Sequence, residues 1–181
     1  ELKNCVSISI EGIKFIEDAF KNLSEGNAIM PPIMRLDIEE NNGEVDVKTA
    51  YIKGLDSFAI KMSPGFFDNP KIGLPSTGGL MVLLSSKTGA LEAVLLDKGY
   101  LTDIRTALAG AISVKYLAKK EISSVGIIGA GAQAKLQLEA LMLVRKPSEL
   151  RIWSRDSNKV KSYIAEVNKK FDLKILMTKN P

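Results

Sequence analysis

Hydrophobic positions in the first half of the chain change from helical spacing to strand-like runs. An amphipathic helix is predicted over about residues 10–25, ending at Gly26, because apolar side chains recur every three or four positions: Ile13, Ile16, Phe20 and Leu23. Runs that predict strands follow at about 29–38, 45–53, 58–62, 80–84 and 91–96. Turn signals at Asn41-Asn42-Gly43 and Lys87-Thr88-Gly89 predict two hairpins. A second helix is predicted from Thr102, which can cap its first turn, to about Leu117.

The remaining residues alternate between short apolar strands and helices. Strand patterns at 125–128, 150–153 and 173–177 are separated by a leucine-rich helical stretch and by a second helix at about 158–169. This β-α-β-α-β order is typical of a parallel sheet whose connections are helices.

A glycine-rich turn joins the first of these strands to its helix. Gly129, Gly131 and Ala134 form the pattern G-x-G-x-x-A. In dinucleotide-binding folds the first glycine makes a tight turn, the second lets backbone N–H groups approach a pyrophosphate, and the third small residue allows close packing. An unrelated glycine-rich turn would look the same, but the flanking β-α-β-α-β pattern favours nucleotide binding. We therefore expect an α/β protein: an α+β domain over residues 1–120, then the first half of a Rossmann NAD(P)-binding domain over 121–181.

The residues after the second of these strands bear on the choice between NAD and NADP. An NAD site usually places a carboxylate there for the ribose 2′-hydroxyl, whereas an NADP site offers an arginine to the 2′-phosphate. Here Ser154 and Arg155 come first and Asp156 follows. Arg155 could hold a phosphate through paired hydrogen bonds, or it could be a solvated side chain, with Asp156 or Ser157 capping the next helix. The order of these residues favours NADP.

Composition excludes several kinds of chemistry. The 181 residues contain no histidine, so within them there is no histidine-dependent catalytic triad and no His-ligated metal site. Proton transfer would fall to Lys, Asp, Glu or Tyr. The 25 basic and 21 acidic residues are mixed, without a basic run interleaved with aromatic residues, so nucleic-acid binding is not expected. The apolar runs are strand-sized rather than membrane-spanning, and the lone Cys5 fits a reducing, cytoplasmic location.

Two segments of the first domain could carry chemistry. Residues 59–85 are rich in proline and glycine, which suits either a ligand-binding surface or a set of ordinary turns. Arg105 falls in the first turn of the helix predicted from Thr102, where the helix dipole disfavours a cation, and this points to a nearby anion. A solvent-facing arginine is the alternative, because it would lose only about a few tenths of a kcal/mol there.

Four segments of the chain resemble one protein family in order and spacing. They are MPPIMRLDI, GLDSFAIKMSPGFFDNPKIGLPS, GLMVLLSSKTGALEAVLLDKGYLTDIRTA and VGIIGAGAQA, and they resemble the ornithine cyclodeaminase/mu-crystallin family. The resemblance implies an N-terminal domain that binds substrate and forms a homodimer, and a Rossmann domain that binds NAD or NADP. It implies hydride transfer at the α-carbon of a small amino or imino acid, such as cyclodeamination of ornithine to proline or reduction of a cyclic ketimine. Mu-crystallins give the alternative, a non-catalytic NADP-binding protein that holds another ligand.

The resemblance also implies roles for individual residues. Arg35 matches the family's substrate-carboxylate arginine, Lys61 its active-site lysine, and Arg105 an arginine that touches both substrate and cofactor. Arginine forks hold a carboxylate well, and a partly desolvated lysine can exchange protons with an amine or imine. The implied cofactor contacts are Thr77 (or Ser76), Arg105, Gly129, Gly131, Ala132, Gln133, Ser154 and Arg155.

One residue of the implied site lies outside the sequence. The family's catalytic aspartate belongs to the second half of the Rossmann domain, whereas this chain ends at Pro181. We expect the chain to be a fragment that is inactive by itself. Its strand at 124–128 would then be an open, apolar sheet edge that is prone to associate with other chains.

Overall fold

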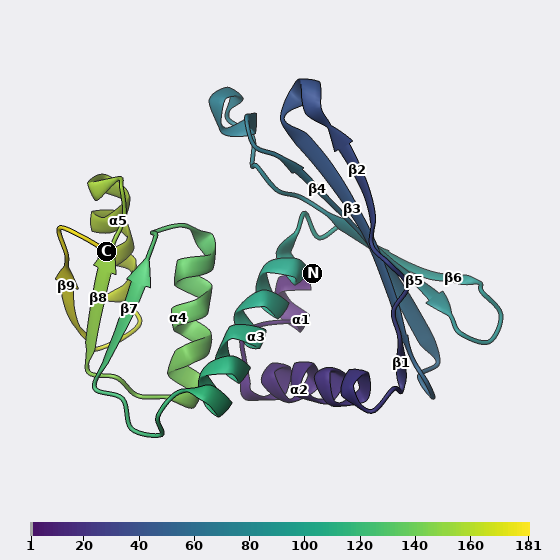
Figure 1. Cartoon of the computed structure of the whole chain (residues 1–181), viewed down its shortest axis with the longest axis horizontal. Helices are drawn as coiled ribbons and strands as arrows, with labels where there is room; N and C mark the ends of the chain where they lie inside the picture. The colour runs from purple at the N-terminus through teal and green to yellow at the C-terminus, as the bar shows by residue number, and fades with distance from the viewer. Residues whose placement is uncertain (1) are drawn as a thin grey trace. The chain divides into compact units, whose positions relative to one another are not determined.

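The computed structural model describes residues 2–181 (Figure 1). These residues form two compact units. The first runs up to Val6 and from Glu17 to Thr102, and the second comprises Ser7–Ile16 and Asp103–Pro181. Helices α2 (Ile10–Ser24) and α3 (Tyr100–Leu117) each contribute residues to both units. The domain boundary expected at residue 120 lies inside the second unit and stays a prediction.

The first unit is built on a six-stranded antiparallel sheet (Figure 1). Its order is β1-β3-β4-β5-β6, and β2 also pairs with β3. The strands are β1 (Ala28–Ile29), β2 (Met34–Ile38), β3 (Gly43–Ile52), β4 (Ser57–Phe66), β5 (Leu80–Ser85) and β6 (Leu91–Leu95). The short helices of this unit are α1 (Leu2–Cys5), η1 (Glu39–Asn41) and η2 (Asn69–Ile72). The expected α+β character is confirmed.

The continuous strand expected over 29–38 is wrong, whereas the hairpin that follows it is correct. Pro31 and Pro32 separate β1 from β2, because proline has no N–H to donate to a strand ladder. Both short strands still pair with the edge of β3 that faces away from β4. At the turn, Asn42 adopts the left-handed conformation with φ 46°, as a tight hairpin requires.

Helix α3 begins two residues earlier than expected, and Thr102 is not its cap. The backbone N–H of Leu101 donates to Oδ2 of Asp97 at 2.8 Å, so Asp97 supplies the capping carboxylate. This carboxylate is buried, with 8% of the residue exposed. Arg105 is consequently in the second turn of α3 rather than the first, and the argument from the helix dipole no longer applies to it.

The second unit contains the predicted parallel sheet. Its elements are β7 (Ser124–Ile128), α4 (Ala132–Val144), β8 (Glu149–Trp153), α5 (Ser157–Val167) and β9 (Lys174–Met177). The strands pair in parallel in the order β7-β8-β9, with β7 at an edge (Figure 1). This arrangement is a partial Rossmann-like fold and confirms the expected β-α-β-α-β order.

The core of this unit lies between the sheet and the two helices. Its buried members come from α4, β8, α5 and the start of the last strand: Leu138, Leu150, Ile152, Val160, Tyr163, Val167 and Leu173. The hydroxyl of Tyr163 donates to the backbone carbonyl of Ala134 at 3.2 Å, and burial raises the pKa of this phenol. This hydrogen bond joins α5 to α4 at the third small position of the glycine pattern. Within residues 2–181 no helix is both long and apolar enough to cross a membrane.

Candidate functional site

The glycine turn of the second unit has the conformation that the sequence pattern predicts. Gly129 has φ 107°, a value that side chains rarely adopt, and its N–H donates to the carbonyl of Trp153 at 2.7 Å. Gly131 is the N-cap residue of α4 and makes no side-chain capping bond. A Cβ built on Gly131 would meet no heavy atom within 4 Å. The start of α4 is thus uncapped by a side chain and has open space at Gly131, which suits an anionic ligand at the first N–H groups of the helix.

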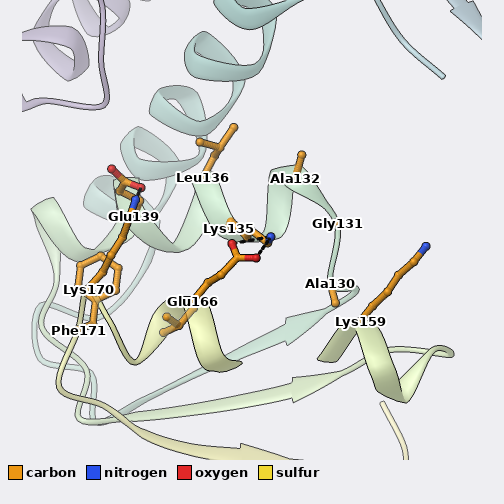
Figure 2. Close-up of a pocket in the computed structure, with 11 residues that line it drawn as sticks. Ala130, Gly131, Ala132, Lys135, Leu136, Glu139, Lys159, Glu166, Lys170 and Phe171 are labelled. Atoms are coloured by element: carbon orange, nitrogen blue, oxygen red, sulfur yellow. Dashed lines mark hydrogen bonds and ion pairs between the residues drawn. The ribbon is translucent and has the colours of Figure 1, made fainter. Parts of the chain in front are cut away.

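A cavity of about 470 Å³ lies beside this turn (Figure 2). Ala130, Gly131 and Ala132 form one end of its lining, and side chains of α4, of α5 and of the segment after α5 form the rest. Lys135 of α4 pairs with Glu166 of α5 at 2.7 Å, and Lys170, after α5, pairs with Glu139 of α4 at 2.8 Å.

Lys159 differs from the other two lysines of this cavity. It belongs to the first turn of α5 and lines the cavity together with Ala130 and Gly131, although its ammonium group points away from them (Figure 2). Across residues 2–181 it has no carboxylate partner, whereas Lys135 and Lys170 are both neutralised. An unneutralised ammonium next to the glycine turn adds positive potential where a phosphate would bind.

The residues after β8 divide into free and engaged side chains. Oδ1 of Asp156 accepts the backbone N–H groups of Asn158 at 2.9 Å and Lys159 at 3.2 Å, so Asp156 is the N-cap of α5. Arg155 is exposed and has no ion-pair partner in the part of the chain that the structure describes. The acid nearest the end of β8 is thus occupied by the helix, while the arginine before it is available.

In the first unit, the strand register places Arg35 and Lys61 on the same face of the sheet. Arg35 of β2 is opposite Asp46 of β3, Asp46 is opposite Ser63 of β4, and Lys61 is two residues from Ser63. Side chains directly opposite each other, or two residues apart, share a face, so these four belong together. The strands carrying Arg35 and Lys61 are both neighbours of β3 and are therefore about 10 Å apart.

The bridge between Gly65 and Thr77 extends this face. Because Thr77 is directly opposite Gly65, and Gly65 is two residues from Ser63, Thr77 lies on the face of Lys61. Ser76 instead uses its carbonyl to accept the N–H of Phe66 at 2.7 Å. Of the two residues considered for a cofactor contact, Thr77 is the one that shares the face of Lys61.

The charges on this face are closely paired. The Arg35 guanidinium donates through Nε to Asp37 at 2.9 Å and through Nη2 to Glu44 at 2.5 Å, and the bond to Asp37 is the main reason that its pKa is raised. Lys48 bonds Asp46 at 3.0 Å and lowers the pKa of that carboxyl, and the positive charges of Arg35 and Lys61 add to the effect. Nζ of Lys61 donates to the hydroxyl of Thr102 at 3.4 Å.

Two residues of these sites were not found from the sequence. Asp46 would follow from extending the hairpin register outward from the Asn-Asn-Gly turn, which aligns it with Arg35. Lys159 would follow from the helix expected from about residue 158, because a residue at the start of that helix falls in its first turn.

The remaining predicted residues belong to the second unit, where Gln133 takes an unexpected direction. Its side-chain amide donates to Oδ1 of Asp103 at 2.8 Å, so only its backbone is left to face a cofactor. Arg105 is exposed on α3 and has no carboxylate partner among residues 2–181. The predicted site residues are thus divided between the units: Arg35, Lys61 and Thr77 in the first, and Arg105, Gly129, Gly131, Ala132, Gln133, Ser154 and Arg155 in the second.

The glycine turn, the parallel strand order and the helix that follows define a partial Rossmann-like unit, a fold typical of dinucleotide-binding proteins, joined to an α+β unit. The model of the ornithine cyclodeaminase/mu-crystallin family matches residues 1–181, and the chain belongs to that family. The family expected from the four sequence segments is thereby confirmed.

Relatives of this chain have several reaction types in their names. An uncharacterized cyclodeaminase of Sinorhizobium fredii is 54% identical over 100% of this chain and 55% of its own length. Thermococcus litoralis Δ1-pyrroline-2-carboxylate reductase, solved with NADH and L-proline, has a TM-score of 0.89 and 32% identity over 96% of this chain and 53% of its own. An archaeal alanine dehydrogenase dimer with bound NAD has a TM-score of 0.87 and 32% identity over 96% and 52%. The chain spans about half the length of these relatives.

Proposed function

We propose that the protein containing this chain is an NAD(P)-dependent enzyme that transfers hydride at the α-carbon of a small amino or imino acid. The observation that carries the proposal is the conjunction of two features in one family member. One is the open glycine turn at the start of α4, and the other is the sheet face that holds Arg35, Asp46 and Lys61. The nicotinamide would supply the hydride acceptor or donor when bound.

Arg35 is suited to hold the carboxylate of such a substrate. Its Nε and Nη2 atoms are committed to Asp37 and Glu44, which fixes the plane of the guanidinium. Among the described residues, Nη1 has no partner, and its two N–H groups are free to donate to a carboxylate oxygen. Arg105 would contribute a second cation, as its place in the L-T-D-x-R-T segment indicates.

Lys61 and Asp46 would interact with the nitrogen of the substrate. A lysine close to the α-carbon can take a proton from an ammonium or return one to the product amine. The Asp46 carboxyl, whose pKa is lowered by its bond with Lys48, is negative at neutral pH and would attract an ammonium or iminium group. In this proposal the free Nη1 group of Arg35 would meet the carboxylate end of an amino acid, and Asp46 and Lys61 the nitrogen end.

We further propose that the cofactor is NADP rather than NAD. Arg155 and Lys159 are both unneutralised in the described structure and stand at the beginning of α5, where a 2′-phosphate would be attracted. The carboxylate of Asp156 comes after Arg155 in the chain, and its Oδ1 atom caps α5 by accepting two backbone N–H groups. Ser154 would add a hydroxyl donor beside them.

The protein is proposed to act as a homodimer through its first unit. The sheet face opposite Arg35 presents Met34, Leu36, Met62 and Val94, which are 62%, 58%, 37% and 50% exposed. Burial of such a contiguous apolar face by a second copy would remove it from water. One relative of known structure, the archaeal alanine dehydrogenase, is a dimer.

The test is turnover by the full-length protein with NADPH or NADH and a cyclic imino acid, followed by the absorbance of the reduced nicotinamide. Lys61→Met is expected to lower kcat by roughly 100-fold or more, the usual contribution of a proton-transfer group. Lys120→Met, at an exposed position outside both sites, is the matched control and should leave kcat unchanged. Cofactor binding without turnover of any amino or imino acid would contradict the proposed enzymatic activity and favour a crystallin-type binding protein.

A further inference from the structure

Two glutamine side chains join α4 to α3 within the second unit. Nε2 of Gln133 donates to Oδ1 of Asp103 at 2.8 Å and lies 3.3 Å from the backbone carbonyl of the same residue. One turn later, Nε2 of Gln137 lies 3.4 Å from both the carbonyl of Thr106 and Oε1 of Gln133. All of these contacts are partly buried, so water competes for them less than at the surface.

Gly110 of α3 leaves the space that the Gln137 side chain occupies. A Cβ built on Gly110 would lie 1.8 Å from Oε1 of Gln137, so even alanine there would displace this side chain. Ala107 and Ala111 on the same helix are completely buried. Gly110 thus leaves room for Gln137 to reach the backbone of α3 at Thr106.

The contact between Gln133 and Asp103 connects the start of α4 with the part of α3 that carries Arg105. Gln133 is the second residue of α4, directly after the open glycine turn. Asp103 stands two residues before Arg105 on α3, and residues at that spacing do not face each other on a helix. Asp103 therefore bonds Gln133 and does not neutralise Arg105, which stays free for a ligand.

We propose that Gln133 and Asp103 are positioning residues that hold the turn carrying Arg105 at a fixed place relative to the glycine turn. This inference rests on the proposed function, in which Arg105 touches both substrate and cofactor. A contact 1 Å out of place can cost a large part of the rate, so a fixed distance between these turns has direct value for catalysis. The bond is charge-assisted, because an ionised carboxylate accepts from the amide.

The test measures substrate KM, kcat and cofactor Kd in the full-length protein. Asp103→Ala is expected to raise KM roughly three- to tenfold, the range that follows from loss of one hydrogen bond, with a smaller change in kcat. Asp103→Asn should stay near wild type, because its side-chain carbonyl still accepts from Gln133. Ser113→Ala is the matched control, since it removes a bond of 3.2 Å to the carbonyl of Ala109 within α3 itself.

A double-mutant cycle with Arg105→Ala separates positioning from a general structural effect. If Asp103 acts through Arg105, then Asp103→Ala has no further effect on KM in the Arg105→Ala background. Equal effects in the two backgrounds would overturn the inference, as would a wild-type KM for Asp103→Ala alone. Failure of the proposed function would look different: Arg105→Ala would itself leave the binding of carboxylate ligands and of NADPH unchanged.

Discussion

Removal of the Tyr163 hydroxyl tests whether its hydrogen bond to the backbone of α4 stabilises the Rossmann-like unit. This tyrosine is completely buried in the core of the Rossmann-like unit, and its hydroxyl donates to the Ala134 carbonyl at 3.2 Å. Tyr163→Phe keeps the ring and removes only the donor. The expected loss is about 1 kcal/mol of unfolding free energy, the net value of one such hydrogen bond.

Truncation of Tyr163 to alanine is expected to lower the unfolding free energy more than Tyr163→Phe does. Tyr163→Ala removes the ring from a site in contact with Leu138, Leu150 and Val160, and such cavities cost roughly 3–5 kcal/mol. Comparing the free-energy losses of the two variants therefore separates the contribution of the hydrogen bond from that of the packing of the ring.

Urea unfolding followed by tryptophan fluorescence provides the measurement. Trp153 is the single tryptophan of the 181 residues and lies on β8 of the same unit, so its emission reports on this core. With a slope of about 2 kcal/mol/M, Tyr163→Phe should lower the midpoint by about 0.5 M. Tyr51→Phe is the control, because the Tyr51 hydroxyl only accepts a long contact of 3.4 Å from the Gly54 N–H. A midpoint for Tyr163→Phe equal to that of wild type would refute the stabilising role of the Tyr163–Ala134 hydrogen bond.

Two further predictions concern the cofactor and the pH dependence of stability. Arg155→Asp should weaken NADPH binding far more than NADH binding in fluorescence titrations, because it removes a phosphate partner and adds a repulsive charge; an unchanged preference would exclude Arg155 as the selector. The pKa of Glu149 is lowered mainly by its hydrogen bond with Arg151 and further by its bond with Lys174. The contribution of Glu149 to stability is therefore complete above the unfolded pKa near 4, and it is lost as the pH falls through the lower pKa of the folded state. The urea midpoint should therefore fall below about pH 4, and Glu149→Gln should reduce that fall, whereas an identical pH profile for the variant would contradict the pairing.

Local sequence determined the elements whose causes lie within a few residues. The periods of the apolar residues placed α2, α4, α5 and the three parallel strands, because helices and strands expose one face at fixed spacings. The left-handed Asn42 and the positive φ of Gly129 are likewise properties that the residues carry themselves. For these reasons the local sequence is sufficient to predict the hairpin and the glycine turn.

Tertiary structure decided which partner each polar side chain takes. Asp97 caps α3 in place of Thr102, and Asp156 rather than Ser157 caps α5, because the choice between neighbouring polar residues depends on where the helix begins. Asp46 faces Arg35 only through the register of β2 with β3, and Gln133 reaches Asp103 only because the fold brings α4 beside α3. These contacts join residues distant in the chain, so their energies depend on the packed structure and are absent from any local pattern.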